Sequence, residues 1–313
     1  MAQILNRKPV LAAYGAGVDS TAMLIEKIAR GEPVDMVLFA DTGSEKPETY
    51  AYLEMFRGWL QAHGVPSAVV RYIPKDFKNH PPYKTLEENC LTNGTLPSKA
   101  FGFGSCSMKW KVQPQEQFAR TWQPAIDAWA RGDTVLKLIG YDCSPADDRR
   151  YHDRAGYGDD KRYTYEYPLR DWGWKREDCI KRILEAGLPE PPKSACFFCP
   201  VTKPHELHEM GPGLLRRIVL MEARAKPRLT TVQGLWRNPV KGLRGATPRP
   251  GSMTEYIRDK GLLPAHEIDD IIERVPTELM RAAKASAALP FEKRQSLASW
   301  LEGAGFPKPE AGT

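Results

Sequence analysis

The sequence predicts an α/β fold, a doubly wound and mostly parallel sheet with an appended helical C-terminal region. Three observations predict it. Short apolar runs alternate with helical patterns over residues 8–141, polar or Gly-rich turns follow the apolar runs, and Pro- and Gly-rich breaks separate helical segments beyond residue 200. Ligands on such sheets bind outside the carboxyl ends of the strands. We therefore expect the loops that follow the strands to face one crevice.

The expected elements follow from the hydrophobic patterns. Helices are expected from about residue 19 to 30, from Pro47 to about residue 63, and from about residue 114 to 131. Residues 74–112 are rich in Pro, Gly, Asn and Lys, which is typical of an active-site loop rather than core. The expected strands are residues 8–14, 34–40, 65–72 and 134–141.

Composition and charge narrow the class of protein. With 42% hydrophobic and 27% charged residues in 313, the chain is typical of a globular protein with one large or two modest domains. Its apolar stretches fall short of the roughly 20 residues that a membrane helix needs, and the start MAQILNRKPVLAAY lacks a signal-peptide core. We therefore expect a cytoplasmic protein that makes no contact with a membrane.

The net charge of +6 is concentrated in one part of the chain. A basic segment with only Glu222 in opposition either binds nucleic acid or forms a solvated basic face, and no recognition motif decides between the two. Its basic residues are Arg216, Arg217, Arg224, Lys226, Arg228, Arg237, Lys241, Arg244 and Arg249.

A Gly-rich stretch, AAYGAGVDSTAML, follows the first expected strand. Gly15 and Gly17 let the backbone turn tightly, and the first N–H groups of the next helix have no intrahelical partner. Together with the helix dipole they form a cradle for a phosphate, to which Ser20 and Thr21 add hydroxyl donors. Asp19 would share a divalent cation with the phosphate or cap the helix. An ordinary capped Gly-rich turn is an equally good interpretation of this stretch alone.

Longer stretches add a resemblance to a known family. GAGVDST resembles the PP-loop of the adenine nucleotide alpha hydrolase superfamily, and FADTGSEKPET resembles the Asp-Thr-Gly...Pro-Glu-Thr stretch of its phosphoadenosine phosphosulfate (PAPS) reductase branch. IGYDCSPADDRR and YPLRDWGWKREDC are similar to two later blocks of that branch. The resemblance covers roughly residues 8–200 in the right order, which makes it more specific than any single motif.

The chain also departs from the family pattern. Gly15 and Ala16 replace a Ser and a Gly, and Tyr141 and Asp142 stand where an Arg is frequent. The Glu-Cys-Gly-Leu-His tail of the thioredoxin-dependent reductases is absent, as is the adjacent Cys-Cys pair of the iron-sulfur adenylyl-sulfate reductases. A sulfate-assimilation reductase is therefore not the first expectation.

The resemblance implies that ATP is hydrolysed between its α- and β-phosphates with Mg²⁺, which adenylates an acceptor and releases pyrophosphate. It implies a PP-loop nucleotide-binding α/β domain at residues 1–200, with the later cysteines included, and a mainly helical region at residues 201–313. Catalytic roles fall to Asp19, Lys109 and Arg149. Lys109 and Lys111 follow Cys106 in FGFGSCSMKWK, where they either contact phosphates and lower the pKa of that thiol or form a solvated basic loop. The nucleotide-binding residues implied are Gly15, Ala16, Gly17, Val18, Asp19, Ser20, Thr21, Asp41, Thr42, Gly43 and Gly140.

The six cysteines indicate metal or redox chemistry, because disulfides are rare in a reducing compartment. Cys196 and Cys199 form a C-x-x-C in which both thiolates can bind one metal. A redox dithiol and two buried small residues are the alternatives. Cys106, with Cys179 or Cys90 as the fourth ligand, would complete a set of cysteines, which favours the 4Fe-4S cluster that sulfur-transfer members of the superfamily carry. Cys179 is otherwise explained as a buried thiol in a helix.

A zinc site is the second expectation for the metal. His205 and His208 would complete a C-x-x-C...H-x-x-H set, although their spacing is shorter than the usual zinc-finger pair.

The sequence thus predicts an ATP pyrophosphatase of PAPS reductase-like type that adenylates a substrate for sulfur transfer. We interpret that substrate as a nucleic acid and expect a protein as the sulfur donor. The first alternative is a reductase that acts on adenylyl sulfate or PAPS. The second is a non-catalytic nucleotide-binding regulatory or DNA-associated protein, which the altered loop at Gly15 and Ala16 supports.

Overall fold

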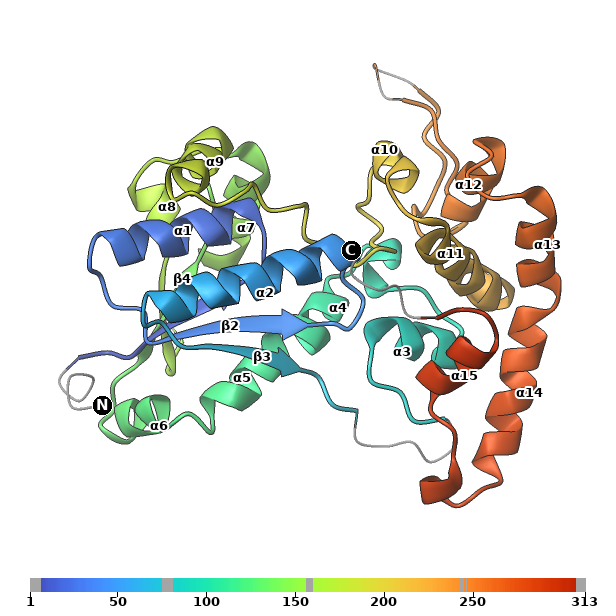
Figure 1. The fold of residues 1–313 in the computed structure, drawn as a ribbon, viewed down its shortest axis with the longest axis horizontal. Helices are drawn as coiled ribbons and strands as arrows, with labels where there is room; N and C mark the ends of the chain where they lie inside the picture. Colours follow the sequence, from blue (N-terminus) through green and yellow to red (C-terminus); the bar gives the residue numbers. More distant parts are fainter. Residues whose placement is uncertain (1–6, 75–80, 156–159, 243–244, 246, 308–313) are drawn as a thin grey trace.

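The predicted parallel α/β sheet is confirmed. The computed structural model describes residues 7–74, 81–155, 160–242, 245 and 247–307, and Figure 1 shows their arrangement. In this part of the chain a five-stranded sheet has the order β3-β2-β1-β4-β5, and all of its neighbouring strands are parallel. Its strands are β1 (Val10–Tyr14), β2 (Met36–Asp41), β3 (Ser67–Arg71), β4 (Val135–Ile139) and β5 (Tyr163–Glu166).

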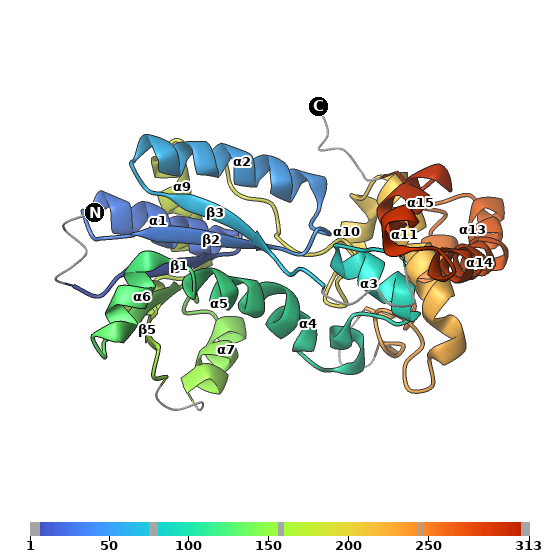
Figure 2. The ribbon, with the colours of Figure 1, turned by 90° about the horizontal axis from the view of Figure 1, so that it is seen from below.

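Helices cover both faces of this sheet, as Figure 2 shows. Successive side chains of a strand point to opposite faces, so Ala12 of β1 packs in the core beneath α1, α2 and α9, whereas Leu11 packs with Ala119 and Ala125 on the other side. The strands therefore read as continuous apolar runs because both of their faces are buried. The covering helices are α1 (Val18–Ala29), α2 (Pro47–Ala62), α9 (Arg176–Glu185), α5 (Gln113–Ala119) and α6 (Gln123–Ala130).

Two expectations about these elements need correction. The single helix expected from about residue 114 to 131 is two helices, α5 and α6, because Pro124 at the start of α6 has no N–H to continue the ladder and Trp122 is extended. The strand β5, only four residues long, was not expected from the sequence. Two further helices, α7 (Pro145–Ala155) and α8 (Pro168–Asp171), flank it in the chain.

Much of the expected loop at residues 74–112 is helical, apart from residues 75–80, which lie outside the described residues. Thr85 caps the first helix by accepting a hydrogen bond from the N–H of Glu88, and Gly94 ends that helix in the left-handed region. Leu91 and Trp110 are buried, so this segment contributes to the core. Its elements are α3 (Leu86–Asn93), η1 (Ser98–Phe101), α4 (Ser105–Ser107) and η2 (Met108–Val112).

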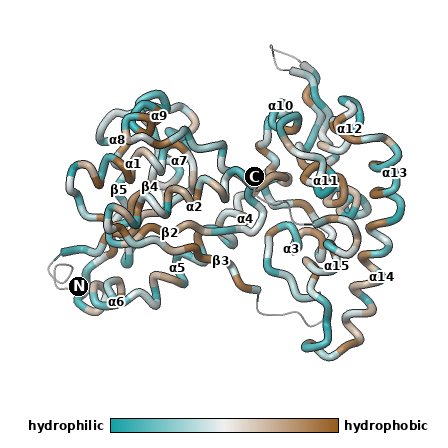
Figure 3. Tube along the Cα trace, viewed as in Figure 1, coloured by the Kyte–Doolittle hydropathy of each residue, from teal (hydrophilic) through white to brown (hydrophobic). Residues whose placement is uncertain are grey.

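The C-terminal part is helical, as expected, and is built around α11. Figure 3 shows hydrophobic residues along the strands and along α11. The core around α11 also takes Leu86 to Trp110 from the earlier segment, and a buried ion pair at 2.7 Å joins Arg217 of α11 to Glu87 of α3. The helices are α10 (Pro204–His208), α11 (Pro212–Ala225), η3 (Lys226–Arg228), α12 (Met253–Asp259), α13 (Ala265–Glu273), α14 (Val275–Ala287), η5 (Phe291–Lys293) and α15 (Leu297–Gly303).

The expected domain boundary at residue 200 stays a prediction. The hydrophobic cores do not divide the chain at one point, because residues 86–110 pack with residues 196–306. Among the described residues, every helix is too short or too polar to cross a membrane.

Candidate functional site

A cavity of about 400 Å³ opens at the carboxyl ends of β1 and β4. The chain leaves β1 toward β2 on one side of the sheet and later returns to form β4 on the other side, so this is the point where the strand order reverses. Open α/β sheets bind their ligands at this point. The Gly-rich loop forms one wall, with Gly15, Gly17, Val18, Asp19 and Ser20, and Gly140 lines the cavity from the end of β4.

The Gly-rich loop is held by its own hydroxyl groups. The Ser20 hydroxyl accepts a hydrogen bond from the N–H of Gly15 at 3.2 Å, and the Thr21 hydroxyl donates to the carbonyl of Gly17 at 2.8 Å. Ala16 and Thr21 are buried and do not line the cavity. We expected the two hydroxyls to contact a phosphate, but in the structure they shape the loop. The N–H groups at the start of α1 remain the donors that suit an anion.

Ala16 occupies a left-handed backbone conformation, with φ of 54°. Non-glycine residues rarely adopt this conformation, because the Cβ crowds the backbone. A glycine at this position would adopt the conformation without that cost.

Gly140 lets β4 approach the start of α1. A Cβ at this position would lie 2.9 Å from both the N and the Cα of Ser20, closer than real Cβ contacts come. The glycine is therefore required by packing, in addition to lining the cavity.

Asp19 has the electrostatics of a cation ligand. Its Oδ1 is buried without a hydrogen-bond partner in the described structure. Burial, and then the charge of Asp142, raise the pKa of Asp19 to about 6. A buried carboxylate oxygen with no donor is costly, and a divalent cation would supply what it lacks. The residue therefore fits the Mg²⁺ that the sequence implies.

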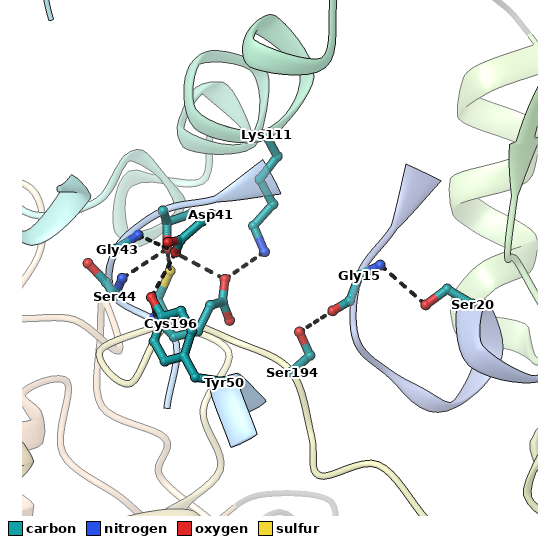
Figure 4. Close-up of polar contacts among 11 residues, drawn as sticks. Gly15, Ser20, Asp41, Gly43, Ser44, Tyr50, Lys111, Ser194 and Cys196 are labelled. Atoms are coloured by element: carbon teal, nitrogen blue, oxygen red, sulfur yellow. Dashed lines mark hydrogen bonds and ion pairs between the residues drawn. The ribbon is translucent and has the colours of Figure 1, made fainter. Parts of the chain in front are cut away.

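Three cationic side chains, Lys111, Arg176 and Lys193, line the same cavity. Figure 4 shows Lys111 beside the Cys196 loop and Ser194 beside Gly15. The Ser194 hydroxyl donates to the carbonyl of Gly15, which ties the segment before the C-x-x-C to the Gly-rich loop. Cations around a helix N-terminus make the cavity suitable for a polyanionic ligand.

Lys111 connects the cavity with the cysteines. Its ammonium lies 3.0 Å from Oε1 of Glu45, a buried residue that pairs by its backbone with Cys196. Burial alone would lower the pKa of Lys111, but the charge of Glu45 raises it above the ordinary value. The ammonium is therefore charged in the physiological range.

The predicted residues after β2 are engaged within the protein. Asp41 accepts hydrogen bonds from the Gly43 N–H at 2.7 Å, the Tyr50 hydroxyl at 2.7 Å and Arg71 Nε at 2.8 Å. The Thr42 hydroxyl lies 3.2 Å from Cys196 Sγ. None of the three predicted residues lines the described cavity, and their contacts shape this loop and join it to the C-x-x-C segment.

The two other residues given catalytic roles lie elsewhere. The Lys109 ammonium lies 4.9 Å from the centre of the Tyr72 ring, whereas Lys111, two residues on, reaches the cavity. Arg149 is exposed on α7 and does not line the cavity. Their catalytic roles stay predictions.

The structure separates the four candidate metal ligands into two cores. Cys106, Cys196 and Cys199 belong to the core around α11 or pack against it. Cys179 lies on α9 in the core between that helix and the sheet. Burial raises the pKa of Cys196 and of Cys199. All six cysteines are free thiols.

As they are placed, these residues do not fit a metal centre. Within the described part of the chain, no group of three or more His, Cys, Asp or Glu side chains has the geometry to hold a metal ion. The zinc alternative fares no better, because His208 Nε2 lies 3.2 Å from the Tyr256 hydroxyl and both His205 and His208 are exposed on α10. A cluster would have to draw the Cys106 loop toward the turn at Cys196 and Cys199.

Sequence reasoning missed part of the cavity wall. Gln115, Arg176, Lys193 and Ser194 line it but were not proposed as site residues, and Lys111 was considered as a phosphate contact without being assigned to the site. The sequence signal for Lys193 and Ser194 was weak: the polar pair stands one residue before the C-x-x-C, and it reaches the cavity only because the segment crosses to Gly15.

Comparisons with known proteins find similarities among solved structures. No family model matches the chain, and no curated protein matches it. Among solved structures, the chain is similar to the phosphoadenylyl-sulfate (PAPS) reductase from Candida auris in its phosphate complex, with a TM-score of 0.36 and 16% identity. That similarity covers 60% of this chain and 77% of the reductase chain.

Proposed function

We propose that this chain is a nucleotide-dependent enzyme of the PAPS reductase-like type, which binds ATP in the cavity at the ends of β1 and β4. The observation that carries the proposal is the composition of the cavity wall: a Gly-rich loop at the N-terminus of α1 faces Lys111, Arg176 and Lys193. Such a wall supplies N–H donors and positive charge for a triphosphate on opposite sides. Adenylation requires this, because the β- and γ-phosphates must be held as the leaving group while the α-phosphate is attacked.

The chain's own residues have distinct roles in this proposal. The first N–H groups of α1 and the cations Lys111 and Lys193 hold the phosphates. Asp19 would hold Mg²⁺, which supplies charge neutralisation when it is bound. Glu45 positions Lys111 through its buried carboxylate.

The acceptor, in our proposal, is a nucleic acid that is adenylated for sulfur transfer from a donor protein in the cytoplasm. A 4Fe-4S cluster at Cys106, Cys196 and Cys199 is part of this expectation, but no step is assigned to it, because the thiols are not gathered. The alternative as a reductase of adenylyl sulfate or PAPS uses the same cavity for a shorter polyanion. The non-catalytic alternative draws its support from the strained Ala16.

The first experiment measures pyrophosphate release from ATP with and without Mg²⁺. Asp19→Ala should abolish the Mg²⁺-dependent release and leave the fold intact, because it removes a polar side chain at the cavity and little core volume. Asp259→Ala, which removes an exposed carboxylate at the end of α12, is the matched control and should behave as wild type. Full activity of Asp19→Ala would contradict the role of Asp19.

A second measurement separates binding from chemistry. A Cβ at Gly17 would lie 3.9 Å from the Cβ of Ser194, so the further methyls of Gly17→Val extend into the space between the loop and that segment. We expect nucleotide affinity, measured by calorimetry, to fall sharply, as it should for Lys111→Met. Lys181→Met, at an exposed position on α9, is the control for loss of a cation. Unchanged affinity in both cavity variants would show that the nucleotide binds elsewhere.

The alternatives give different products. Sulfite release from adenylyl sulfate or PAPS with a thiol donor would identify a reductase. Nucleotide binding without pyrophosphate or sulfite would favour the non-catalytic protein. Mass spectrometry of host nucleic acids with and without the gene tests the proposed acceptor.

A further inference from the structure

Three stretches of the chain contain no acidic residue, although the chain has 39 Asp and Glu among 313 residues. They are residues 89–115, 191–205 and 223–254. Each of them carries lysines, and the last carries most of the basic segment. The three stretches lie far apart in the sequence, and no acidic residue within a stretch offsets its positive charge.

The fold places the three stretches side by side. Arg228 donates a hydrogen bond at 2.6 Å to the carbonyl of Asn93, and the Trp236 indole donates at 2.8 Å to the carbonyl of Thr202. The Arg237 guanidinium approaches Gly102 so closely that a Cβ there would lie 3.2 Å from Nη1. The cations of the three stretches are thus gathered on one part of the molecule, where Lys111 pairs with Glu45 and Lys193 with Glu206.

Not all of the basic segment is available to a partner. Arg217 is buried against Glu87, Arg216 pairs with Glu267 at 2.7 Å, and Arg249 lies over the Trp236 ring at 4.7 Å. Arg244 lies outside the described residues. These contacts exclude the segment as a uniform basic face. Its exposed cations in the described structure are Lys226, Arg228, Arg237 and Lys241, and the guanidinium of Arg237 lies beside the Gly102 loop.

An exposed aromatic ring stands among those cations. Phe103 is 66% exposed between Gly102 and Gly104, which is unusual for a phenylalanine. Three exposed cations accompany this ring: Lys99 and Lys109 lie on the same segment as Phe103, and Arg237 lies on the segment that contacts Gly102. None of the three forms an ion pair with a residue that the structure describes. We call Lys99, Phe103, Lys109 and Arg237 the basic loop surface.

The basic loop surface adjoins the cysteines. Cys106 lies on the same loop, three residues after Phe103, and packs against the core that also takes Cys196 and Cys199. Lys111, at the end of η2, reaches the nucleotide cavity. A partner on this surface would therefore lie next to the elements that we assign to the chemistry.

We propose that the basic loop surface binds a single-stranded segment of nucleic acid, with a base stacked on Phe103 and phosphates near Lys99, Lys109 and Arg237. A basic surface fits a polyanion, but the exposed ring selects among polyanions, because only an unpaired base offers a free planar face to it. A duplex hides those faces, and an acidic polypeptide has none in its charged side chains. The assignment of this strand as the acceptor rests on the proposed function, whereas the binding of a strand to the basic loop surface does not depend on that function.

The test measures fluorescence anisotropy of a labelled 20-nucleotide single strand without ATP, at several salt concentrations. We expect salt-dependent binding that a duplex of the same sequence or poly-glutamate displaces only weakly. Phe103→Ala should weaken it by about fivefold or more, the loss of one stacked base. Phe291→Ala, at a 51% exposed ring between α14 and α15, should leave affinity unchanged.

A charge variant completes the test. Arg237 has a φ of 68°, so Arg237→Gly removes the guanidinium and relieves the backbone at once. It should lower affinity and the salt dependence, whereas Lys181→Ala should change neither. No binding at low salt would overturn the proposal, as would equal affinity for strand and duplex, displacement by poly-glutamate, or wild-type binding by Phe103→Ala. ATP affinity measured on the same samples tests the proposed function separately.

Discussion

Replacing Gly140 with alanine tests whether the cavity depends on the contact between β4 and α1. The new Cβ would lie 2.9 Å from the N and Cα of Ser20 and 3.2 Å from the carbonyl carbon of Asp19. All three are backbone atoms at the start of α1, so no flexible side chain can yield, and the strand end and the helix must move apart. The backbone of Gly140 has no positive φ, so the substitution changes the contact alone.

Overpacking of this kind costs about 1–3 kcal/mol of folding free energy. In a chain of this size we expect Tm to fall by about 1.5–2 °C for each kcal/mol. Nucleotide affinity should fall as well, because the displaced atoms carry the N–H groups that face the cavity. Urea unfolding, differential scanning calorimetry and titration with ATP measure the three effects.

Gly58→Ala is the matched control, because it makes the same chemical change at an exposed position inside α2 with no atom within 4 Å of the new Cβ. There alanine should raise stability by about 0.5–1 kcal/mol, since glycine is unfavourable in a helix. Opposite signs for the two variants are expected. A Gly140→Ala protein with wild-type stability and ATP affinity would refute the inferred contact.

Four further results are expected. Glu222→Gln should destabilise the protein by about 3 kcal/mol in urea, because the buried carboxylate accepts four hydrogen bonds that an amide can only partly accept. Ala16→Gly should leave urea stability within about 1 kcal/mol of wild type or raise it, since relief of the left-handed backbone offsets the lost methyl. Burial would raise the pKa of Glu206, but hydrogen bonds and charges from lysines lower it below its usual 4.5. Glu206→Gln should therefore lower the free energy of unfolding at neutral pH, and this difference from wild type should disappear as the pH falls below 4.5. If the Cys106 loop moves to the turn at Cys196 and Cys199, protein purified without oxygen should be brown and contain iron and sulfide, Cys106→Ala should lose much of that colour, and Cys179→Ala, in the other core, should keep it. A colourless protein with stoichiometric zinc would contradict the cluster.

The sequence was most informative where one short stretch determines its own structure. The loop from Gly15 to Ser20 could be placed at the cavity because a strand, a Gly-rich turn and a helix are contiguous, and Gly140 because the carboxyl ends of parallel strands meet. The same reasoning gave four of the five strands within about two residues. β5 was missed because its four residues are too few to establish a period.

Residues placed by tertiary contacts could not be predicted. Lys109 and Lys111 are alike in sequence, but residues two apart on a helical turn face different ways. Lys109, which is nearer to Cys106, therefore contacts the Tyr72 ring, whereas Lys111 lines the cavity. Asp41 looked available for a ligand, yet Arg71 and Tyr50 occupy its oxygens. Such partners become visible only after the sheet is assembled.

The contacts of the Gly-rich loop bear on how a nucleotide would bind. Its shape is held from inside by Ser20 and Thr21 and from outside by Ser194, while the first N–H to enter the α1 ladder is that of Thr21, at 3.1 Å from the Gly17 carbonyl. The N–H groups before it are therefore available without rearrangement of the loop, so a ligand does not have to order the loop in order to bind. It follows that Ser194→Ala, which removes the outer contact and no charge, should weaken ATP binding by loosening the loop, and that it should leave the core around α11 unchanged.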